Sequence, residues 1–175
     1  MKYFAYGSNM LTERIKARVP SAKNPTHLAL QKYRLRFHKK SVDCSGKCNI
    51  VATECDEDMV HGVLFEIEAN QIGALDEAEG VGKGYRSDEI TISLNGTETN
   101  IFIYVAEKDA VDEALVPYRW YYDLVLSGAE QHRLPSDYVA GLRAIPFTHD
   151  PKPDRKSRLD ALDALQKYAE SRKTA

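Results

Sequence analysis

Three carboxylates are crowded into the segment 75–80, which reads Leu-Asp-Glu-Ala-Glu-Gly. We predict a short helix from Asn70 to about Gly80, so that Asp76, Glu77 and Glu79 lie near its C-terminal end. The helix dipole disfavours negative charge at that end, neighbouring carboxylates disfavour it too, and both effects raise the pKa of a carboxyl group. A raised pKa suits general acid–base chemistry near neutral pH. The alternative interpretation is an acidic surface turn, and so short a helix does not indicate which carboxylate faces inward.

The start of the chain is a second segment that suggests chemistry, and it reads Tyr3-Phe4-Ala5-Tyr6-Gly7-Ser8-Asn9-Met10. Its first residues predict a strand, Gly-Ser-Asn predicts a sharp turn, and the apolar residues that follow have helical spacing. A glycine lets the backbone approach a ligand closely, and the N–H groups at a helix start can bind an anion. The turn is therefore a candidate cradle for an oxyanion or a carboxylate. On geometry alone, a plain strand-to-helix turn with Asn9 as N-cap is the favoured interpretation.

Tyrosines near predicted turns and element ends form a third group of candidates. The chain has ten tyrosines and five phenylalanines. A tyrosine combines an apolar ring with a hydroxyl that can orient a polar ligand. The tyrosines in such positions are Tyr6, Tyr85, Tyr104, Tyr118, Tyr121 and Tyr122. Taken one at a time, each is more typical of the edge of a core than of a ligand contact.

A zinc site is the remaining chemical possibility. Three cysteines and two histidines come close together in the sequence, namely Cys44, Cys48, Cys55, His38 and His61. Their spacing fits no standard zinc site, and the cysteines lie in or beside predicted strands. We therefore expect no metal.

Strands dominate the first two thirds of the chain. We predict them at 33–37, 50–53, 60–67, 90–94 and 101–105. Asn95-Gly96 predicts a tight hairpin between the last two strands. The basic run from Lys32 to Lys40 alternates with apolar residues, which indicates a strand with one solvated face and not a nucleic-acid contact.

The last third of the chain predicts helices. One covers residues 122–126 and ends near Gly128, and another begins at Leu134-Pro135-Ser136. A C-terminal amphipathic helix at about 155–172 has an apolar face made of Leu159, Leu162, Leu165 and Tyr168. Strands first and helices later predict an α+β fold with a mostly antiparallel sheet or barrel. We expect a single domain over residues 1–175.

Composition narrows the class of protein. The chain of 175 residues is 43% hydrophobic and 29% charged, which is typical of one globular domain. A net charge of −2 gives no reason to expect nucleic acid or a membrane surface as partner. No apolar run has the length of a membrane span, and no signal peptide is visible. Three cysteines, an odd number, favour a reducing compartment, so we expect a cytoplasmic protein.

Three segments together resemble the γ-glutamylcyclotransferase family. The stretch from Tyr3 to Ile15 is similar to the opening motif of that family, and the stretch from Leu75 to Val81 is similar to its acidic segment. Tyr121, followed by Ser127-Gly128-Ala129 and Leu134-Pro135, resembles its third block. The matches come in the order of the family and cover residues 3 to about 146. The first motif is long and specific, and the C-terminal helix lies outside the strong match.

The resemblance implies a small mixed β-barrel with flanking helices and a cofactor-free enzyme of glutathione metabolism. Such enzymes cyclise γ-glutamyl compounds and release 5-oxoproline with a free amino acid or amine. The catalytic glutamate of the family corresponds to Glu79. The substrate-binding residues correspond to Tyr6, Gly7, Ser8, Asn9, Met10, Tyr85, Tyr104 and Tyr121. The stretch from Gly80 to Tyr85 is about one residue shorter than in the family, so Arg86 is the alternative to Tyr85 as a pocket residue.

The resemblance leaves several functions open. The substrate is expected to be a small γ-glutamyl amino acid, a γ-glutamyl amine or isopeptide, or a γ-glutamylated biosynthetic intermediate. These substrates differ only on the leaving-group side, which one sequence does not resolve. A non-catalytic binding domain of the same fold is the alternative outside enzymes, and the presence of Glu79 argues against it. Either a monomer or a homodimer is compatible with the sequence.

Overall fold

Five strands form the main sheet of the protein, which is described over residues 1–174 of a computed structural model. The strand order is β2-β5-β1-β7-β6. The strands are β1 (Lys2–Ala5), β2 (Lys23–Gln31), β5 (Met59–Glu66), β6 (Tyr85–Leu94) and β7 (Thr97–Ala106). All neighbours run antiparallel except β1 and β7, which pair in parallel at Tyr3 and Phe102. The mostly antiparallel α+β fold is thus confirmed, whereas Ala175, the last residue of the expected domain, lies outside the described residues.

The other two strands, β3 (Tyr33–Lys40) and β4 (Gly46–Ala52), form a separate two-stranded sheet. The strands of residues 1–174 therefore do not close into one hydrogen-bonded barrel, and the barrel expectation is wrong. β4 packs near β7 without a backbone ladder between them. The side chain of Asn49 bridges this gap, because its Oδ1 accepts a hydrogen bond of 2.8 Å from the Ala106 N–H. A side chain thus takes the place of a strand-to-strand bond.

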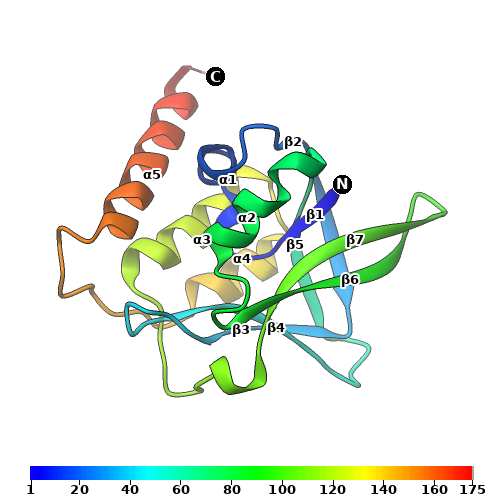
Figure 1. Cartoon of the computed structure of the whole chain (residues 1–175), viewed down its shortest axis with the longest axis horizontal. Helices are drawn as coiled ribbons and strands as arrows, with labels where there is room; N and C mark the ends of the chain where they lie inside the picture. The colour runs from blue at the N-terminus through cyan, green and yellow to red at the C-terminus, as the bar shows by residue number, and fades with distance from the viewer. Residues whose placement is uncertain (175) are drawn as a thin grey trace.

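In Figure 1, α5 and α3 lie on the left, α1, α2 and α4 lie nearer the centre, and β6 and β7 extend to the right. The α-helices are α1 (Thr12–Arg18), α2 (Ile72–Glu79), α3 (Arg119–Gln131), α4 (Ser136–Arg143) and α5 (Lys156–Thr174). Short 3-10 turns precede or connect them at η1 (Ser8–Met10), η2 (Ala69–Gln71) and η3 (Lys108–Ala110). None of the helices within residues 1–174 combines the length and the apolar character needed to span a membrane.

The strand predictions were confirmed except at one edge. Asn95 and Gly96 both have positive φ, 52° and 79°, as the predicted hairpin between β6 and β7 requires. The edge strand β2 was missed. It contains Pro25, its register shifts between Lys23 and Thr26, and Asn24 has a φ of 52°. A proline and a bulge are tolerated at a sheet edge, and they hide the strand from a pattern search.

Helix α3 does not end near Gly128, as the sequence predicted, but continues to Gln131. A Cβ at Gly128 would lie 2.6 Å from the Leu11 N and 2.7 Å from the Met10 Cβ. The glycine therefore marks a close contact between α3 and the opening loop and not the end of the helix. This contact fixes where the loop lies.

Helix α5 packs against α1 and α3, but with a different face from the expected one. Ala161 and Ala164 are buried together with Tyr168, whereas Leu159 is 50% exposed and Leu162 is 41% exposed. Small alanines allow the close approach of a helix, and the two leucines face outward. The expected helix exists, but part of its expected apolar face is wrong.

Candidate active site

The opening loop connects β1 to α1 through the 3-10 turn η1. Gly7 has a φ of −121°, which is open to any residue, so the glycine is required for another reason. A Cβ at Gly7 would lie 3.1 Å from both the Cys48 Cβ and the Tyr121 hydroxyl. The absent side chain thus lets the loop lie close to β4 and α3, which together bound a pocket.

The backbone N–H groups of the loop are partly free. The N–H of Met10 donates to the Gly7 carbonyl at 3.0 Å. In the described part of the chain the N–H groups of Gly7, Ser8 and Asn9 have no acceptor. Three amide donors in one turn form a ready site for an anion or an oxyanion.

The structure places Met10 apart from the other predicted residues of the opening loop. Its side chain is fully buried in the core, it does not line the pocket, and its N–H is used within the turn. The donor set of the opening motif is therefore residues 7–9.

Asn9 does not cap α1, because the N-cap position belongs to Leu11 and carries no side-chain hydrogen bond. The Asn9 amide points into the pocket instead. Its Nδ2 donates to the Tyr3 hydroxyl at 3.1 Å and to Oε1 of Glu79 at 2.9 Å. Asn9 therefore connects the opening loop to the acidic segment.

The short helix α2 presents two of its three carboxylates to the pocket side. Glu77 is exposed, while Asp76 and Glu79 are half-buried three residues apart on one face. Asp76 accepts a hydrogen bond of 2.7 Å from the Tyr104 hydroxyl. Gly80 ends the helix in the left-handed conformation with a φ of 73°, which places Glu79 at the last helical position. Gln71, not Asn70, occupies the N-cap position.

Arg18, from the last turn of α1, forms an ion pair with Glu79 that the sequence reasoning did not anticipate. The two side chains are 19% and 17% exposed, so the pair lies at the mouth of the pocket. The same Arg18 nitrogen donates to Oδ1 of Asn9 at 2.9 Å. Both partners of Glu79 bind its Oε1, and in the described part of the chain its Oε2 has no hydrogen-bond partner. One carboxylate oxygen is thus held and the other remains available.

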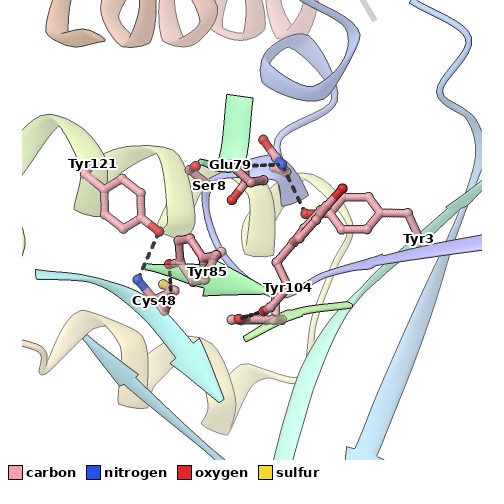
Figure 2. A pocket seen from close by; sticks show the side chains of 10 residues that line it. Tyr3, Ser8, Cys48, Glu79, Tyr85, Tyr104 and Tyr121 are labelled. Atoms are coloured by element: carbon pink, nitrogen blue, oxygen red, sulfur yellow. Dashed lines mark hydrogen bonds between the residues drawn. The ribbon is translucent and has the colours of Figure 1, made fainter. Parts of the chain in front are cut away.

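The inner pocket is the name we give to the space around these groups, shown in Figure 2. It is lined by Tyr3, Tyr6, Gly7, Ser8, Asn9, Cys48, Glu79, Tyr85, Tyr104 and Tyr121. Tyr121, Tyr85 and Cys48 lie on one side in Figure 2, Tyr3 and Tyr104 lie on the other, and Glu79 with Ser8 lies between them. Except for Met10, the fold brings the predicted site residues together. Tyr3 and Cys48 were not predicted as site residues.

Of the two alternatives for this part of the pocket, Tyr85 lines it and Arg86 does not. Tyr85 is buried in the wall, whereas Arg86 is exposed and pairs with Asp88 at 2.8 Å. The tyrosines at 118 and 122 do not line the inner pocket. Their hydroxyls donate to the carbonyls of Asp43 and Arg143.

Two tyrosines hold the backbone of Cys48. The Cys48 N–H donates to the Tyr121 hydroxyl at 3.1 Å, and the Tyr85 hydroxyl donates to the Cys48 carbonyl. On the opposite wall, the Tyr6 hydroxyl donates to the Tyr104 carbonyl. Several pocket hydroxyls therefore position backbone groups of the protein.

Burial keeps the wall of the inner pocket uncharged. It raises the pKa of Tyr3, Tyr6, Tyr85 and Tyr121 above the usual tyrosine range. Burial also raises the pKa of the Cys48 thiol to about 12, so that this thiol is protonated near neutral pH and is a poor nucleophile. Cys44 and Cys55 are exposed free thiols away from the pocket. Among the residues that line the inner pocket, Glu79 is the one that carries a carboxylate.

A second space, which we call the outer cavity, has a volume of about 210 Å³ and adjoins the inner pocket. Four residues line both spaces, namely Ser8, Glu79, Tyr85 and Tyr121. The remaining residues that line the outer cavity are Arg14, Arg18, Lys39, Ser41, Val42, Asp43, Lys47, Ala78, Trp120, Arg155 and Ser157. Most of these side chains are charged or polar.

The basic run from Lys32 to Lys40 was predicted to place its charged side chains on one solvated face of a strand. This prediction is wrong for Lys39, which is buried. Phe37, His38 and Lys39 are buried one after another, because the register of β3 against β4 shifts between Arg36 and Lys39. Such a bulge redirects side chains. It turns Lys39 into the outer cavity, and no local pattern in the sequence indicates it.

A sequence signal for the outer cavity did exist in α1. Arg14 and Arg18 are four residues apart and lie on one face of the helix. Like charges at this spacing destabilise a helix by a few tenths of a kcal/mol, so their presence indicates another role. In the structure both line the outer cavity.

Comparison with known proteins agrees with this geometry. The sequence model of the AIG2-like family matches residues 59–142, which include α2 and its carboxylates. The chain is 33% identical to γ-glutamylcyclotransferase of Mus musculus, over 97% of this chain and 89% of the mouse protein. It is 34% identical to γ-glutamylcyclotransferase of Homo sapiens, over 82% of this chain and 77% of the human protein. The similarity to the mouse protein thus extends beyond the blocks that end near residue 146.

The solved structures give the same result for the fold. A structure of γ-glutamyl cyclotransferase superimposes with a TM-score of 0.78 and 29% identity, covering 93% of this chain and 98% of that one. The residues that match the AIG2-like family model contribute Glu79, Tyr85, Tyr104 and Tyr121 to the inner pocket. With the identity and coverage of its relatives, the chain belongs to the γ-glutamylcyclotransferase family.

Proposed function

We propose that this protein cyclises γ-glutamyl compounds and releases 5-oxoproline together with a free amino acid or amine. The observation that carries the proposal is the position of Glu79. Its Oε1 is held by Asn9 and Arg18, while its Oε2 has no hydrogen-bond partner among the described residues, in a pocket that residues 7–9 also line. The γ-glutamylcyclotransferase relatives support the same reaction.

The reaction requires only proton transfers and one exchange of carbon–nitrogen bonds. Glu79 takes a proton from the α-ammonium group of the substrate, and the freed amine attacks the γ-carbonyl carbon. A new carbon–nitrogen bond closes the five-membered ring, and the electron pair of the carbonyl moves to its oxygen. When the carbonyl re-forms, the original amide bond breaks with its electron pair going to the departing nitrogen, and Glu79 returns the first proton to that nitrogen. The ring nitrogen gives up its second proton, which the released amine takes up to become an ammonium group. The atoms balance without a co-reactant, so the proposed reaction needs no cofactor.

The pocket favours this reaction mainly by folding the substrate. Ring closure is intramolecular, and correct orientation of the reacting atoms contributes most of the acceleration in such cases. The rings of Tyr6, Tyr85, Tyr104 and Tyr121 form the walls that would hold the γ-glutamyl group. The amide donors of residues 7–9 fit two groups of the substrate, its α-carboxylate and the oxyanion that forms at the γ-carbonyl.

We further propose that residues 1–175 act as a single domain in the cytoplasm. Residues of α5, including Ala161 and Ala164, belong to the same hydrophobic core as β1 and α3, which supports one domain. The free thiols of Cys44, Cys48 and Cys55 are compatible with a reducing compartment.

The test of the reaction is incubation with a panel of γ-glutamyl dipeptides and γ-glutamyl amines, followed by detection of 5-oxoproline. We expect 5-oxoproline from at least one member of the panel. Binding of γ-glutamyl compounds without any 5-oxoproline would contradict the proposal and favour a binding domain. Analytical ultracentrifugation of the same sample distinguishes a monomer from a homodimer.

A further inference from the structure

The outer cavity carries more positive charge than its own carboxylates neutralise. Five of its lining side chains are cationic and two are acidic. Three cations have partners, in the pairs Arg18–Glu79, Lys47–Asp43 and Arg155–Asp150. Within residues 1–174, Arg14 and Lys39 have no ion pair. Two positive charges therefore remain for a ligand, in a protein whose net charge is −2.

Arg14 is the more unusual of the two cations. The residue is only 8% exposed, and its Nε is buried with no hydrogen-bond partner among residues 1–174. A buried charge without a partner is costly, so an arginine in this state indicates a missing anion. Burial lowers the pKa of Arg14 to about 10, which leaves it charged near neutral pH.

Lys39 places its charge at the junction of the two spaces. The bulge in β3 turns it inward, and the residue is 7% exposed. Its Nζ lies 4.5 Å from the centre of the Tyr85 ring, and Tyr85 lines both the inner pocket and the outer cavity. A cation–π contact restrains the ammonium group without neutralising it.

We propose that the outer cavity binds a leaving group with two anionic groups, and that Arg14 and Lys39 recognise them. This inference rests on the proposed function. Glu79 lines both spaces, so the amide bond that breaks beside it directs the γ-glutamyl group inward and the leaving group outward. The α-carboxylate of any leaving amino acid needs one cation. The second unpaired cation is then available for a carboxylate in the side chain of the leaving amino acid. The substrate class is therefore the γ-glutamyl derivatives of dicarboxylic amino acids.

The other lining residues agree with a polar leaving group. Val42 and Ala78 are the only aliphatic residues among those that line the outer cavity, and Val42 is fully exposed. A large apolar side chain would therefore meet mainly charged groups and the rings of Tyr85, Trp120 and Tyr121 there. Ser41 and Ser157 add hydroxyl donors for carboxylate oxygens.

The test compares two substrates of nearly equal shape and different charge, γ-Glu-Glu and γ-Glu-Gln. We measure kcat/KM for 5-oxoproline release from each. Because a hydrogen-bonded charge pair in a buried site is among the stronger polar contacts, we expect γ-Glu-Glu to be preferred by about tenfold or more. A ratio of one or less would overturn the inference while leaving the proposed function intact. No 5-oxoproline from either dipeptide or from the panel would instead overturn the proposed function.

Variants of Lys39 and Arg14 then test which residue is responsible for the preference for γ-Glu-Glu over γ-Glu-Gln. Lys39→Met keeps the unbranched stem and removes the charge, and we expect it to bring the ratio close to one by lowering kcat/KM for γ-Glu-Glu. Lys83→Met, at an exposed lysine that lines neither space, should leave the ratio unchanged. An equal loss for both dipeptides in Lys39→Met would contradict charge recognition. Arg14→Lys keeps the charge and shortens the donor set, so it is expected to reduce the ratio and not to abolish it, with thermal unfolding as the control for folding.

Discussion

The inner pocket and the outer cavity share a wall but differ in how their polar groups are used. In the inner pocket several tyrosine hydroxyls donate to or accept from backbone groups, and burial keeps these phenols neutral. In the outer cavity, Arg14 and Lys39 have no ion-pair partner within residues 1–174. The inner pocket is thus built to hold a shape, and the outer cavity to hold a charge.

Glu79 lines both the inner pocket and the outer cavity, and its position explains why the two spaces differ in charge. A proton transfer beside a neutral, close-fitting wall requires a substrate held in one conformation. The group that leaves has no such requirement, and only its charge needs to be matched. We therefore expect changes in the inner pocket to affect all substrates alike and changes in the outer cavity to affect substrates according to charge.

The largest expected effect comes from Glu79→Gln, which tests whether a change in the inner pocket affects both substrates alike. The amide is nearly isosteric but cannot take a proton, so we expect kcat for 5-oxoproline release to fall by at least about 10³-fold for γ-Glu-Glu and γ-Glu-Gln alike. The matched control is Glu77→Gln, which makes the same change at an exposed residue of α2. It should retain activity within about twofold. A comparable loss in both variants would place the acid–base group elsewhere in the acidic segment.

A smaller effect is expected from Gly128→Ala, which tests whether α3 positions the opening loop. The new Cβ would lie 2.6 Å from the Leu11 N, so the loop or the helix must move. We expect the free energy of unfolding to fall by about 1–3 kcal/mol and kcat/KM to fall for both dipeptides by the same factor. Denaturant unfolding and steady-state kinetics measure the two effects.

The matched control for that change is Gly141→Ala in α4. Apart from its chain neighbours and the backbone of its own helix, no atom of residues 1–174 lies within 4 Å of the position of its Cβ. The substitution should therefore stabilise the protein by about 0.5–1 kcal/mol through helix propensity. If Gly128→Ala also stabilised the protein, the close contact between α3 and the loop would not matter for the site.

The smallest expected effect is a change of substrate preference with pH, which tests whether the outer cavity recognises charge. Burial lowers the pKa of Arg14 to about 10 and lowers that of Lys39 from its usual value, so both lose their protons earlier than free side chains as the pH rises. The carboxylates of the substrate stay charged over this range. The ratio of kcat/KM between γ-Glu-Glu and γ-Glu-Gln should therefore fall from about tenfold at pH 7.5 to less than about threefold at pH 10.5.

A ratio is the right measurement because both dipeptides carry the same α-amino group and would react in the same inner pocket, so that effects of pH on the shared chemistry cancel. A ratio that stays constant up to pH 10.5 would show that the cations of the outer cavity do not recognise charge. A parallel fall of both rates would report only the shared chemistry of the inner pocket.

Much of the scaffold was predictable because it depends on local patterns. Strand alternation and the Asn95-Gly96 hairpin were confirmed. The barrel was wrong because the separation of β3 and β4 depends on which strands pair, and side chains such as Asn49 make the connection instead. Gly128 was misinterpreted because a glycine at a helix end and a glycine at a close contact look the same in a sequence.

The amino-acid sequence by itself determined the acidic segment, the opening loop and the tyrosines as the material of the site. It could do so because motif residues follow each other at fixed spacing along the chain. The family resemblance already assigned Glu79 and not Glu77 to the site. Only the tertiary structure decided that Arg18 pairs with Glu79 and that a bulge turns Lys39 inward. These outcomes depend on contacts between segments that are far apart in the chain, and their free energy is set by packing and burial that no local pattern encodes.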